Sequence, residues 1–271
     1  MRPICLLAPV SLLIGMLAAA PPQYLKQVAK FRADREKSLR SADGWTTLVE
    51  LRWLKPGENR VGSDPKLGTL ILKNGRVEYR SAAGVTTRAK DEEQFLAAGT
   101  RTYFLIHRAD RFGIRVKDSN ALARKQFTHL NWYPVDPSWR IAARFTPYAK
   151  PRKVSFDTVI AGLQEQDEAP GFVTFSRGGH EYRLDPVLDE NELFFIFRDQ
   201  TSGKTTYGAS RFLYADAPRS LKTPGTVILD FNEAINPPCV FTPYATCPLA
   251  PPQNRLALPV TAGELMYNSH R

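Results

Sequence analysis

The chain has 271 residues, of which 43% are hydrophobic and 24% charged, with a formal net charge of +10. This composition is ordinary for a globular protein and excludes a disordered or collagen-like chain. The charge lies in the first half: residues 21–136 hold 22 Lys and Arg against 13 Asp and Glu, whereas residues 137–271 hold 14 of each. A basic half suits an anionic partner, although a solvated basic surface is the commoner meaning. No nucleic-acid partner is predicted, because interleaved stacking aromatics and known motifs are lacking.

The first 20 residues have the pattern of a secretory signal peptide. Met1 and Arg2 form a basic start, residues 4–17 are mostly apolar, and Ala18 to Ala20 supply the small residues before a cleavage site. The apolar run is too short for a stable membrane span, with an uncleaved anchor as the alternative. We therefore expect an exported protein, periplasmic or extracellular, whose mature chain of about 250 residues can bury one or two β domains.

An amphipathic helix is predicted at the start of the mature chain. Pro22 suits a first helical position, and Gly44 ends the pattern. The residues that recur at helical spacing between them are Tyr24, Leu25, Val28, Phe31, Arg35 and Leu39. The basic polar side would suit a membrane surface, but packing across a sheet is the commoner use of such a helix.

After Gly44 the pattern changes to β-strands joined by turns. TLILK-NG-RVEYR, residues 69–80, predicts a hairpin, because Asn74 and Gly75 tolerate the positive φ of a two-residue turn. Further strands are expected in WTTLVELRWL, TYFLIH, FGIRV, WRIAARF, KVSFDTVI, GFVTFS, HEYRL, ELFFIFRD, TTYGASRFLYA and TVILDF. Short connections favour antiparallel sheets over parallel βαβ units, which need a helix in each crossover.

The predicted fold class is therefore mainly β, with antiparallel sandwich-like or barrel-like sheets and one N-terminal amphipathic helix. Two β subdomains are the expected division. Residues 1–20 would be the signal peptide, 21–136 the helix with a basic β subdomain, and 137–271 a second β subdomain that ends in a block rich in Pro and Cys.

Cys239 and Cys247 are the cysteines that would remain after export. An even number in an oxidising compartment predicts a disulfide. It would close a nine-residue loop and contribute roughly 2.5 kcal/mol on the chain-entropy model. A zinc site is the alternative, but zinc favours closer cysteine spacing or nearby histidines. We predict no metal site and no cofactor.

The candidate ligand-binding side chains lie in the last quarter of the chain. In TTYGASRFL, Tyr207 and Arg211 fall on one face of a strand, because strand side chains alternate. Asp230 and Asn232 share a face in VILDFN in the same way. If these strands are neighbours, Arg211 and Asp230 form an ion pair that serves either a ligand or the core. The remaining candidates, with the same two interpretations, are Asn254, Arg255 and Glu264.

Long motifs are spread along the mature chain. They are G-W-x-x-L near Trp45, W-L-x-x-G-x-N-x-V-G-S at 53–63, Y-P-V-D at 133–136, T-S-G-x-x-T-Y-G at 201–208, R-F-L at Arg211, L-D-F-N-x-A-x-N-P-P-C at 229–239, C-P-L-x-P-P-x-N-R-L at 247–256 and A-G-E at Ala262. With these, the chain from about Tyr24 to Leu265 resembles the uncharacterised family called domain of unknown function 1684. The resemblance implies a bacterial or archaeal protein, often exported, and no established activity.

A second likeness concerns Leu54–Leu72, which is similar to the opening of a forkhead-associated β-sandwich. That family reads phosphothreonine through an Arg and a Ser in its loops, to which Arg60 and Ser63 correspond only loosely. We use this likeness for the shape of the first half and not for its function.

Two classes of function follow. The first is an uncharacterised ligand-binding β module of the cell envelope, with a polar pocket in its C-terminal half and an anionic ligand as one option. The second is a hydrolase that uses Asp230 or Glu264 as acid or base, with Arg211 or Arg255 steadying negative charge. The sequence lacks G-x-S-x-G, H-E-x-x-H and a dinucleotide-type glycine loop, which favours the binding module.

Overall fold

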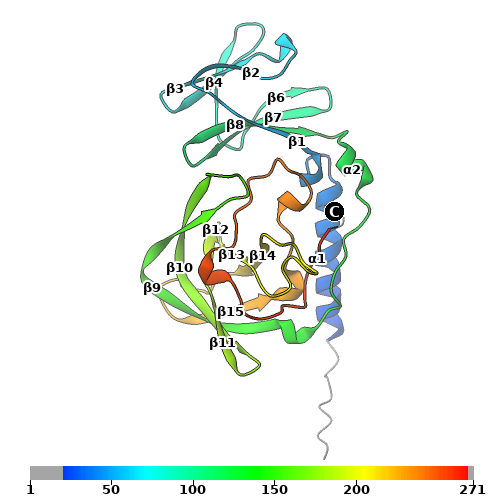
Figure 1. Cartoon of the computed structure of the whole chain (residues 1–271), viewed down its shortest axis with the longest axis vertical. Helices are drawn as coiled ribbons and strands as arrows, with labels where there is room; N and C mark the ends of the chain where they lie inside the picture. Colours follow the sequence, from blue (N-terminus) through cyan, green and yellow to red (C-terminus); the bar gives the residue numbers. More distant parts are fainter. Residues whose placement is uncertain (1–20, 268–271) are drawn as a thin grey trace, which may run out of the picture.

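The computed structural model describes residues 21–267, so the predicted signal peptide lies outside the described residues. Two groups of antiparallel sheets lie one above the other, and one long helix runs along the side of the lower group (Figure 1). Among residues 21–267, no helix has both the length and the apolar character that a membrane span requires.

The helix α1 (Pro22–Arg40) follows the predicted amphipathic segment. Its start at Pro22 is favourable, because a first-turn residue needs no backbone N–H for the helix. Val28 and Leu39 are fully buried. Arg35 Nη2 donates to the backbone carbonyl of Asn236 at 2.9 Å. The helix therefore packs against the C-terminal block, and Leu39 also shares a cluster with Phe127 and Leu130.

The first half of the chain forms a β-sandwich. One sheet has the order β1 (Leu48–Trp53), β8 (Arg111–Asp118), β7 (Arg101–Arg108), β6 (Gln94–Ala98), and the other has the order β2 (Gly57–Arg60), β3 (Thr69–Lys73), β4 (Arg76–Arg80), β5 (Thr86–Ala89). Leu70 and Val77 of one sheet share a core with Leu105 and Ile114 of the other. The predicted hairpin at β3 and β4 is confirmed, with φ of 52° at Asn74 and 68° at Gly75.

The second half contains two further sheets. Their orders are β11 (His180–Leu184), β10 (Gln164–Arg177), β9 (Arg140–Asp157), β15 (Gly225–Asp230), and β12 (Val187–Asp189), β13 (Glu192–Phe197), β14 (Arg211–Asp216). Phe145 and Val173 of the first sheet pack with Phe195 and Leu213 of the second. The side chains between the sheets therefore form a second apolar core.

One difference from the sequence expectation lies in β9. WRIAARF and KVSFDTVI are two predicted strands, but residues 140–157 form a single strand. Pairing with β10 shifts register between Ala169 and Gly171, and this irregularity accommodates the prolines on both strands. A Cβ on Gly171 would lie 2.4 Å from the carbonyl oxygen of Thr146, so only glycine fits that close approach.

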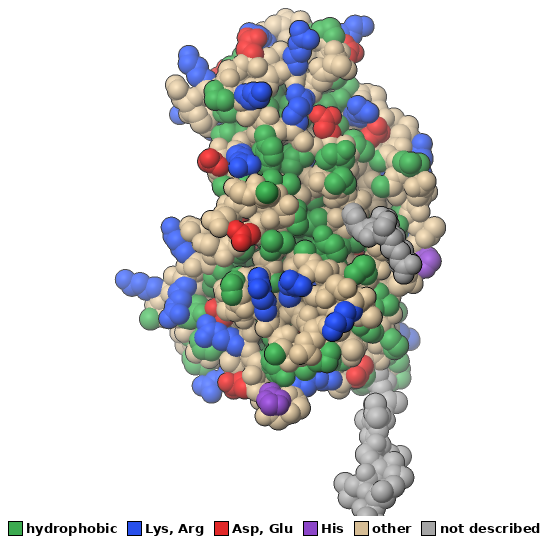
Figure 2. Space-filling view, in the orientation of Figure 1, with side chains coloured by type: hydrophobic (Ala, Val, Ile, Leu, Met, Phe, Trp, Pro, Cys, Tyr) green, Lys and Arg blue, Asp and Glu red, His purple; other side chains and the backbone are tan. Residues whose placement is uncertain are grey.

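The fold is thus mainly β, with four antiparallel sheets, none of which closes into a barrel in the described part of the chain. The remaining helical segments are α2 (Leu122–Gln126) and short 3₁₀ turns. The strands up to β8 pair among themselves, as do those from β9 onward, and the division at residues 136 and 137 stays a prediction. Hydrophobic side chains gather at the waist between the two groups of sheets (Figure 2).

Candidate ligand site

Arg211, the central residue of the predicted site, lies in the core. Its side chain is 0% exposed, and its Nη1 donates to Asp199 Oδ2 at 3.1 Å and to the carbonyl of Val260 at 3.1 Å. Its ion-pair partner is therefore Asp199 and not Asp230. Tyr207 precedes β14, which begins at Arg211, so strand alternation does not relate these two side chains.

Asp230 and Asn232 do lie together, but Asp230 ends β15 and Asn232 belongs to the 3₁₀ turn Phe231–Glu233, so strand alternation does not relate them. Tyr24 of α1 donates its hydroxyl to Asp230 Oδ1 at 2.9 Å, and Asn232 Nδ2 donates to the Tyr24 hydroxyl at 2.9 Å. Arg140 Nε lies 3.7 Å from Asp230 Oδ2. These contacts hold the start of α1 against the second half, which gives the pair a structural role.

Glu233, beside this cluster, provides a pH prediction. Burial, and then the charge of Asp230, raise the pKa of Glu233 to about 7. The folded state therefore binds the proton more tightly than the unfolded state, so stability falls as pH rises from about 4.5 to about 7. Glu233→Gln is expected to remove this fall and to be more stable than wild type by roughly 2 kcal/mol near pH 8.

Urea unfolding from pH 4 to 8 measures the difference in stability, with Glu181→Gln on an exposed side chain as the control. Parallel pH profiles for the wild type and Glu233→Gln would contradict it.

The other predicted residues are dispersed. Asn254 is buried and donates Nδ2 to the carbonyls of Asp185 at 2.9 Å and Ile196 at 3.0 Å. Arg255 is exposed. Glu264 is fully buried and accepts a hydrogen bond from Asn236 Nδ2 at 2.8 Å. The predicted residues therefore do not form one site. Most of them make separate contacts that connect one segment of the chain to another.

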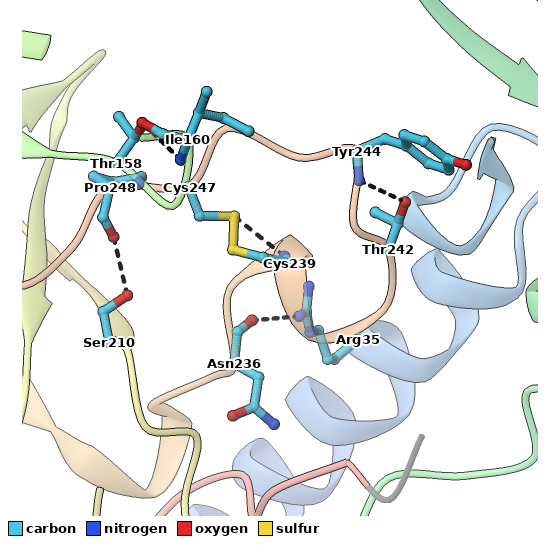
Figure 3. The surroundings of a disulfide bond; sticks show 10 residues. All are labelled: Arg35, Thr158, Ile160, Ser210, Asn236, Cys239, Thr242, Tyr244, Cys247 and Pro248. Carbon is cyan, nitrogen blue, oxygen red and sulfur yellow. Dashed lines mark hydrogen bonds between the residues drawn. A yellow bond between two sulfur atoms is a disulfide. The ribbon is translucent and has the colours of Figure 1, made fainter. Parts of the chain in front are cut away.

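The predicted disulfide between Cys239 and Cys247 is present, with 6.2 Å between the two Cα atoms. Figure 3 shows it beside Arg35 and Asn236, with Ser210 donating to the carbonyl of Pro248 at 3.0 Å. Both cysteines belong to an apolar cluster that includes residues from the first half and from the second. The cross-link therefore fixes the block that lies at the waist.

Removal of this disulfide is expected to lower the free energy of unfolding. A variant with Cys239→Ala and Cys247→Ala is expected to lose roughly 2.5 kcal/mol of unfolding free energy, because its unfolded chain gains loop entropy. Guanidinium unfolding under non-oxidising and oxidising conditions checks this: the wild type should approach the variant when reduced. A variant as stable as the oxidised wild type would contradict the prediction.

A cavity of about 280 Å³ lies at the waist, against the disulfide. We call it the waist pocket. Its charged lining comes from three parts of the fold: Arg35 of α1, Arg108 and Arg115 of β7 and β8, and Glu165 of β10. The backbone around Asn236, Ala245 and Pro248 completes the wall. The pocket therefore needs both groups of sheets and the C-terminal block.

Arg115 is the most buried of the pocket's first-half side chains. Ile114 and Val116, its neighbours on β8, point into the first sandwich, so Arg115 points outward, toward the second half. It is only 6% exposed and donates Nη1 to Glu92 Oε2 at 3.1 Å. Its Cζ lies 5.4 Å from the ring centroid of Trp45. Burial lowers the pKa of the Arg115 guanidinium.

Three side chains of the pocket also have buried polar atoms. Arg35 Nε, Arg115 Nε and Glu165 Oε1 are buried and make no hydrogen bond among residues 21–267, but Arg35 Nε lies 3.5 Å from Glu264 Oε2 in an ion pair. Glu165 Oε1 lies 3.5 Å from Arg108 Nε without accepting its hydrogen bond. Burial raises the pKa of Glu165. Arg35 Nε and Glu165 Oε1 therefore each lie beside an opposite charge of the protein itself.

Aromatic side chains form another part of the pocket wall. Phe194 and Phe212 meet edge to face with ring centroids 4.8 Å apart, and Phe194 stacks on Tyr214 at 4.7 Å. Trp45 also lines the cavity. The walls therefore combine guanidinium groups with flat apolar surface, as ligand sites do.

A larger cavity, of about 670 Å³, lies elsewhere on the second half, lined by Pro147, Tyr148, Pro170, Leu188 and Lys222 among others. Its lining is mostly apolar, and it lacks the convergent guanidinium groups of the waist pocket. We therefore prefer the smaller cavity as the candidate site, because directional polar groups determine specificity.

The sequence analysis did not identify Arg35, Arg108 and Arg115 as site residues. The available signal was an arginine between aliphatic residues in FGIRV, at a position where an outward side chain normally meets solvent. Its burial depends on the second half, which is distant in sequence. Among residues 21–267, no group of three or more His, Cys, Asp or Glu side chains is placed to hold a metal ion.

One comparison with known proteins supports the resemblance found in the sequence. The model of a family described as Protein of unknown function (DUF1684) matches residues 125–265. No curated protein matches the chain. The solution NMR structure of an uncharacterized protein from Haloarcula marismortui is similar, with 29% identity over 54% of this chain and 81% of that one, and a TM-score of 0.46. Glu165 and Phe212 lie within the matched range, whereas Arg35, Arg108 and Arg115 precede it.

Proposed function

The chain belongs to the family described as Protein of unknown function (DUF1684), and from that premise we propose that the protein binds a small organic anion with a flat apolar body in its waist pocket. The observation that carries this proposal is that three arginines, Arg35, Arg108 and Arg115, line one cavity together with aromatic side chains. An oxygen anion would accept from the guanidinium groups while its apolar part lies against Phe212 and Trp45.

The terminal nitrogens of two arginines support this assignment. Arg35 uses Nη2 for the carbonyl of Asn236, and Arg115 uses Nη1 for Glu92. Within the described residues, the other terminal nitrogen of each guanidinium donates no hydrogen bond. Each is therefore free to bind a carboxylate or phosphate oxygen, for which arginine has a suitable geometry.

The hydrolase alternative, with Asp230 or Glu264 as acid or base, has less support, because Asp230 is engaged by Tyr24 and Glu264 is fully buried. Glu165 and Tyr214 both line the waist pocket, but among residues 21–267 no hydrogen bond joins them. Burial, with the charges of Asp189 and Glu192, raises the pKa of Tyr214 to about 12, which disfavours its ionisation. A binding function requires neither group to be activated.

Isothermal titration calorimetry with 3-phenylpropionate tests the binding proposal. Arg115→Met is expected to weaken binding at least about tenfold, because a hydrogen bond to a charged group contributes roughly 1.5–3 kcal/mol. Arg76→Met, on the exposed face of β4, makes the same charge change away from the pocket and should bind like wild type. No binding at millimolar concentration, or equal affinity of wild type and Arg115→Met, would contradict the proposal.

We also propose that the protein acts outside the cytoplasm, on the pattern of residues 1–20. Mass spectrometry of protein from the periplasm or medium should find a mature chain without this segment. A full-length chain found only in the cytoplasm would contradict export, without bearing on the pocket.

A further inference from the structure

The sheet formed by β2, β3, β4 and β5 has an outer face that is rich in basic side chains. Leu70, Val77 and Ala89 point into the core of the first sandwich, so the side chains that alternate with them point outward. The outward side chains, in the register of the sheet, are Glu58, Arg60, Thr69, Ile71, Lys73, Arg76, Glu78, Arg80, Thr86 and Arg88. Five of them are Lys or Arg and two are Glu, which gives this surface, the basic face, a formal charge of +3.

The charges of the basic face are only partly balanced within the protein. Arg80 Nη2 lies 2.6 Å from Glu58 Oε1. Among the exposed cations, Lys73, Arg76 and Arg88 form no ion pair with any residue from 21 to 267. Lys73 and Arg76 are directly opposite each other on β3 and β4, and like charges in that position repel. An anion that faces both side chains would relieve this repulsion.

An exposed apolar loop continues from this face. Residues 81–85, Ser-Ala-Ala-Gly-Val, join β4 to β5 directly after Arg80. Ala82 and Ala83 are exposed, and Val85 is 61% exposed. The loop carries no charged side chain. An apolar tip beside cations is suited to the boundary between lipid headgroups and acyl chains.

The basic face points away from the second half of the protein. Arg115, on the outer face of the other sheet of the sandwich, points toward the second half and lines the waist pocket. Figure 1 shows β2, β3 and β4 at the end of the molecule, beyond β6, β7 and β8. A flat, negatively charged surface can therefore approach this end of the molecule without meeting the second half.

We propose that the basic face and the loop of residues 81–85 bind the surface of a bilayer that contains anionic phospholipids. Lys73, Arg76 and Arg88 would lie against lipid phosphates, while Val85 enters the interfacial region. A soluble polyanion would attract the same cations but would leave Val85 in water, so the apolar loop favours a membrane as the partner. This inference goes beyond the proposed function and does not depend on the waist pocket.

Co-sedimentation with vesicles tests the inference on the chain from Pro21 onward, which contains every element of the described fold and lacks the apolar segment of residues 1–20. Vesicles of phosphatidylcholine mixed with an equal amount of phosphatidylglycerol should bind the protein at least about tenfold more tightly than vesicles of phosphatidylcholine alone, because only the mixed surface is negative. Binding should weaken between about 0.01 M and about 0.15 M ionic strength, because the Debye length falls from roughly 30 Å to 8 Å. No binding to the mixed vesicles at the lower ionic strength, or equal binding to both kinds, would overturn the inference.

A variant with Lys73→Gln and Arg76→Gln tests the basic face. It is expected to bind the mixed vesicles at least about tenfold more weakly than wild type, because two cations near the surface are lost. Arg219→Gln with Lys222→Gln makes the same charge change at exposed positions of the second half and should bind like wild type. If the two double variants bind alike, the basic face is not the surface that contacts lipid.

Val85→Ser distinguishes a membrane from a soluble polyanion. The variant should bind the mixed vesicles at least about fivefold more weakly, because it buries less apolar surface in the bilayer, and its affinity for heparin should not change. Leu122→Ser, at a position on α2 that is 67% exposed, is the matched control and should bind vesicles like wild type. If heparin binds the wild type and Val85→Ser leaves vesicle binding unchanged, the partner is a soluble polyanion and the membrane inference is wrong. The circular dichroism spectrum and melting of each variant confirm that it is folded.

Discussion

Replacing Arg211 by methionine is expected to lower the free energy of unfolding by about 3–5 kcal/mol, because it leaves Asp199 as an unpaired charge in the core. Both side chains of the pair are 0% exposed. Arg211 also donates to the carbonyls of Val260 and Ala262, which would lose their partner. Because methionine has a similar volume, the lost free energy of unfolding comes from the charge and the hydrogen bonds more than from a cavity. Guanidinium unfolding followed by tryptophan fluorescence measures it.

Two further variants make this prediction specific. Arg219→Met removes an exposed arginine and should change stability by less than about 0.5 kcal/mol. Arg211→Met combined with Asp199→Asn should recover part of the loss, because no unpaired charge remains buried. A single Arg211→Met variant within about 1 kcal/mol of wild type would mean that Asp199 finds another partner.

The second large effect is expected at Arg35, which joins α1 to the C-terminal block. Arg35→Met should cost about 3–4 kcal/mol, because Glu264, which is 0% exposed, loses the cation that lies 3.5 Å from its Oε2. Burial raises the pKa of Glu264, and Arg35 opposes that effect. Without Arg35 the pKa rises further, so the loss should be greatest above about pH 7 and smaller near pH 5, where the carboxyl takes up a proton more readily.

Urea unfolding of Arg35→Met at both pH values measures this loss. Arg35→Met combined with Glu264→Gln should be more stable than Arg35→Met alone, because the amide keeps the hydrogen-bonding shape without the charge. Lys26→Met, on an exposed part of the same helix, controls for loss of a helical cation. If Arg35→Met loses the same stability at both pH values, and the double variant recovers none of it, then Glu264 is not the group that causes the loss.

The strands, the opening helix and the disulfide were predictable because local sequence determines them. Alternation and turn residues are sufficient for the hairpin at Asn74 and Gly75. The partner of Arg211 was not predictable, because Asp199 and Asp230 are equally plausible carboxylates until the packing of β14 is known. Periodicity also misplaced Tyr207, since it assumed a strand where the chain turns before Arg211.

The waist pocket could not be predicted from the sequence for a related reason. Its side chains come from α1, the first sandwich and the second half, and only tertiary contacts bring them together. Thr242 of the C-terminal block donates to the carbonyl of Leu48 at 2.9 Å, so this block also joins the two halves. The proline-rich, cross-linked segment thus acts as a scaffold beside the pocket, while the polar groups that face it come mostly from elsewhere.

The most direct test of the account is a crystal structure of the protein with 3-phenylpropionate. We expect the carboxylate within hydrogen-bond distance of Arg115 and Arg35, and the ring against Phe212 in the waist pocket. An anion held only in the larger cavity beside Pro147 and Leu188, with the waist pocket free of it, would contradict the assignment of the site.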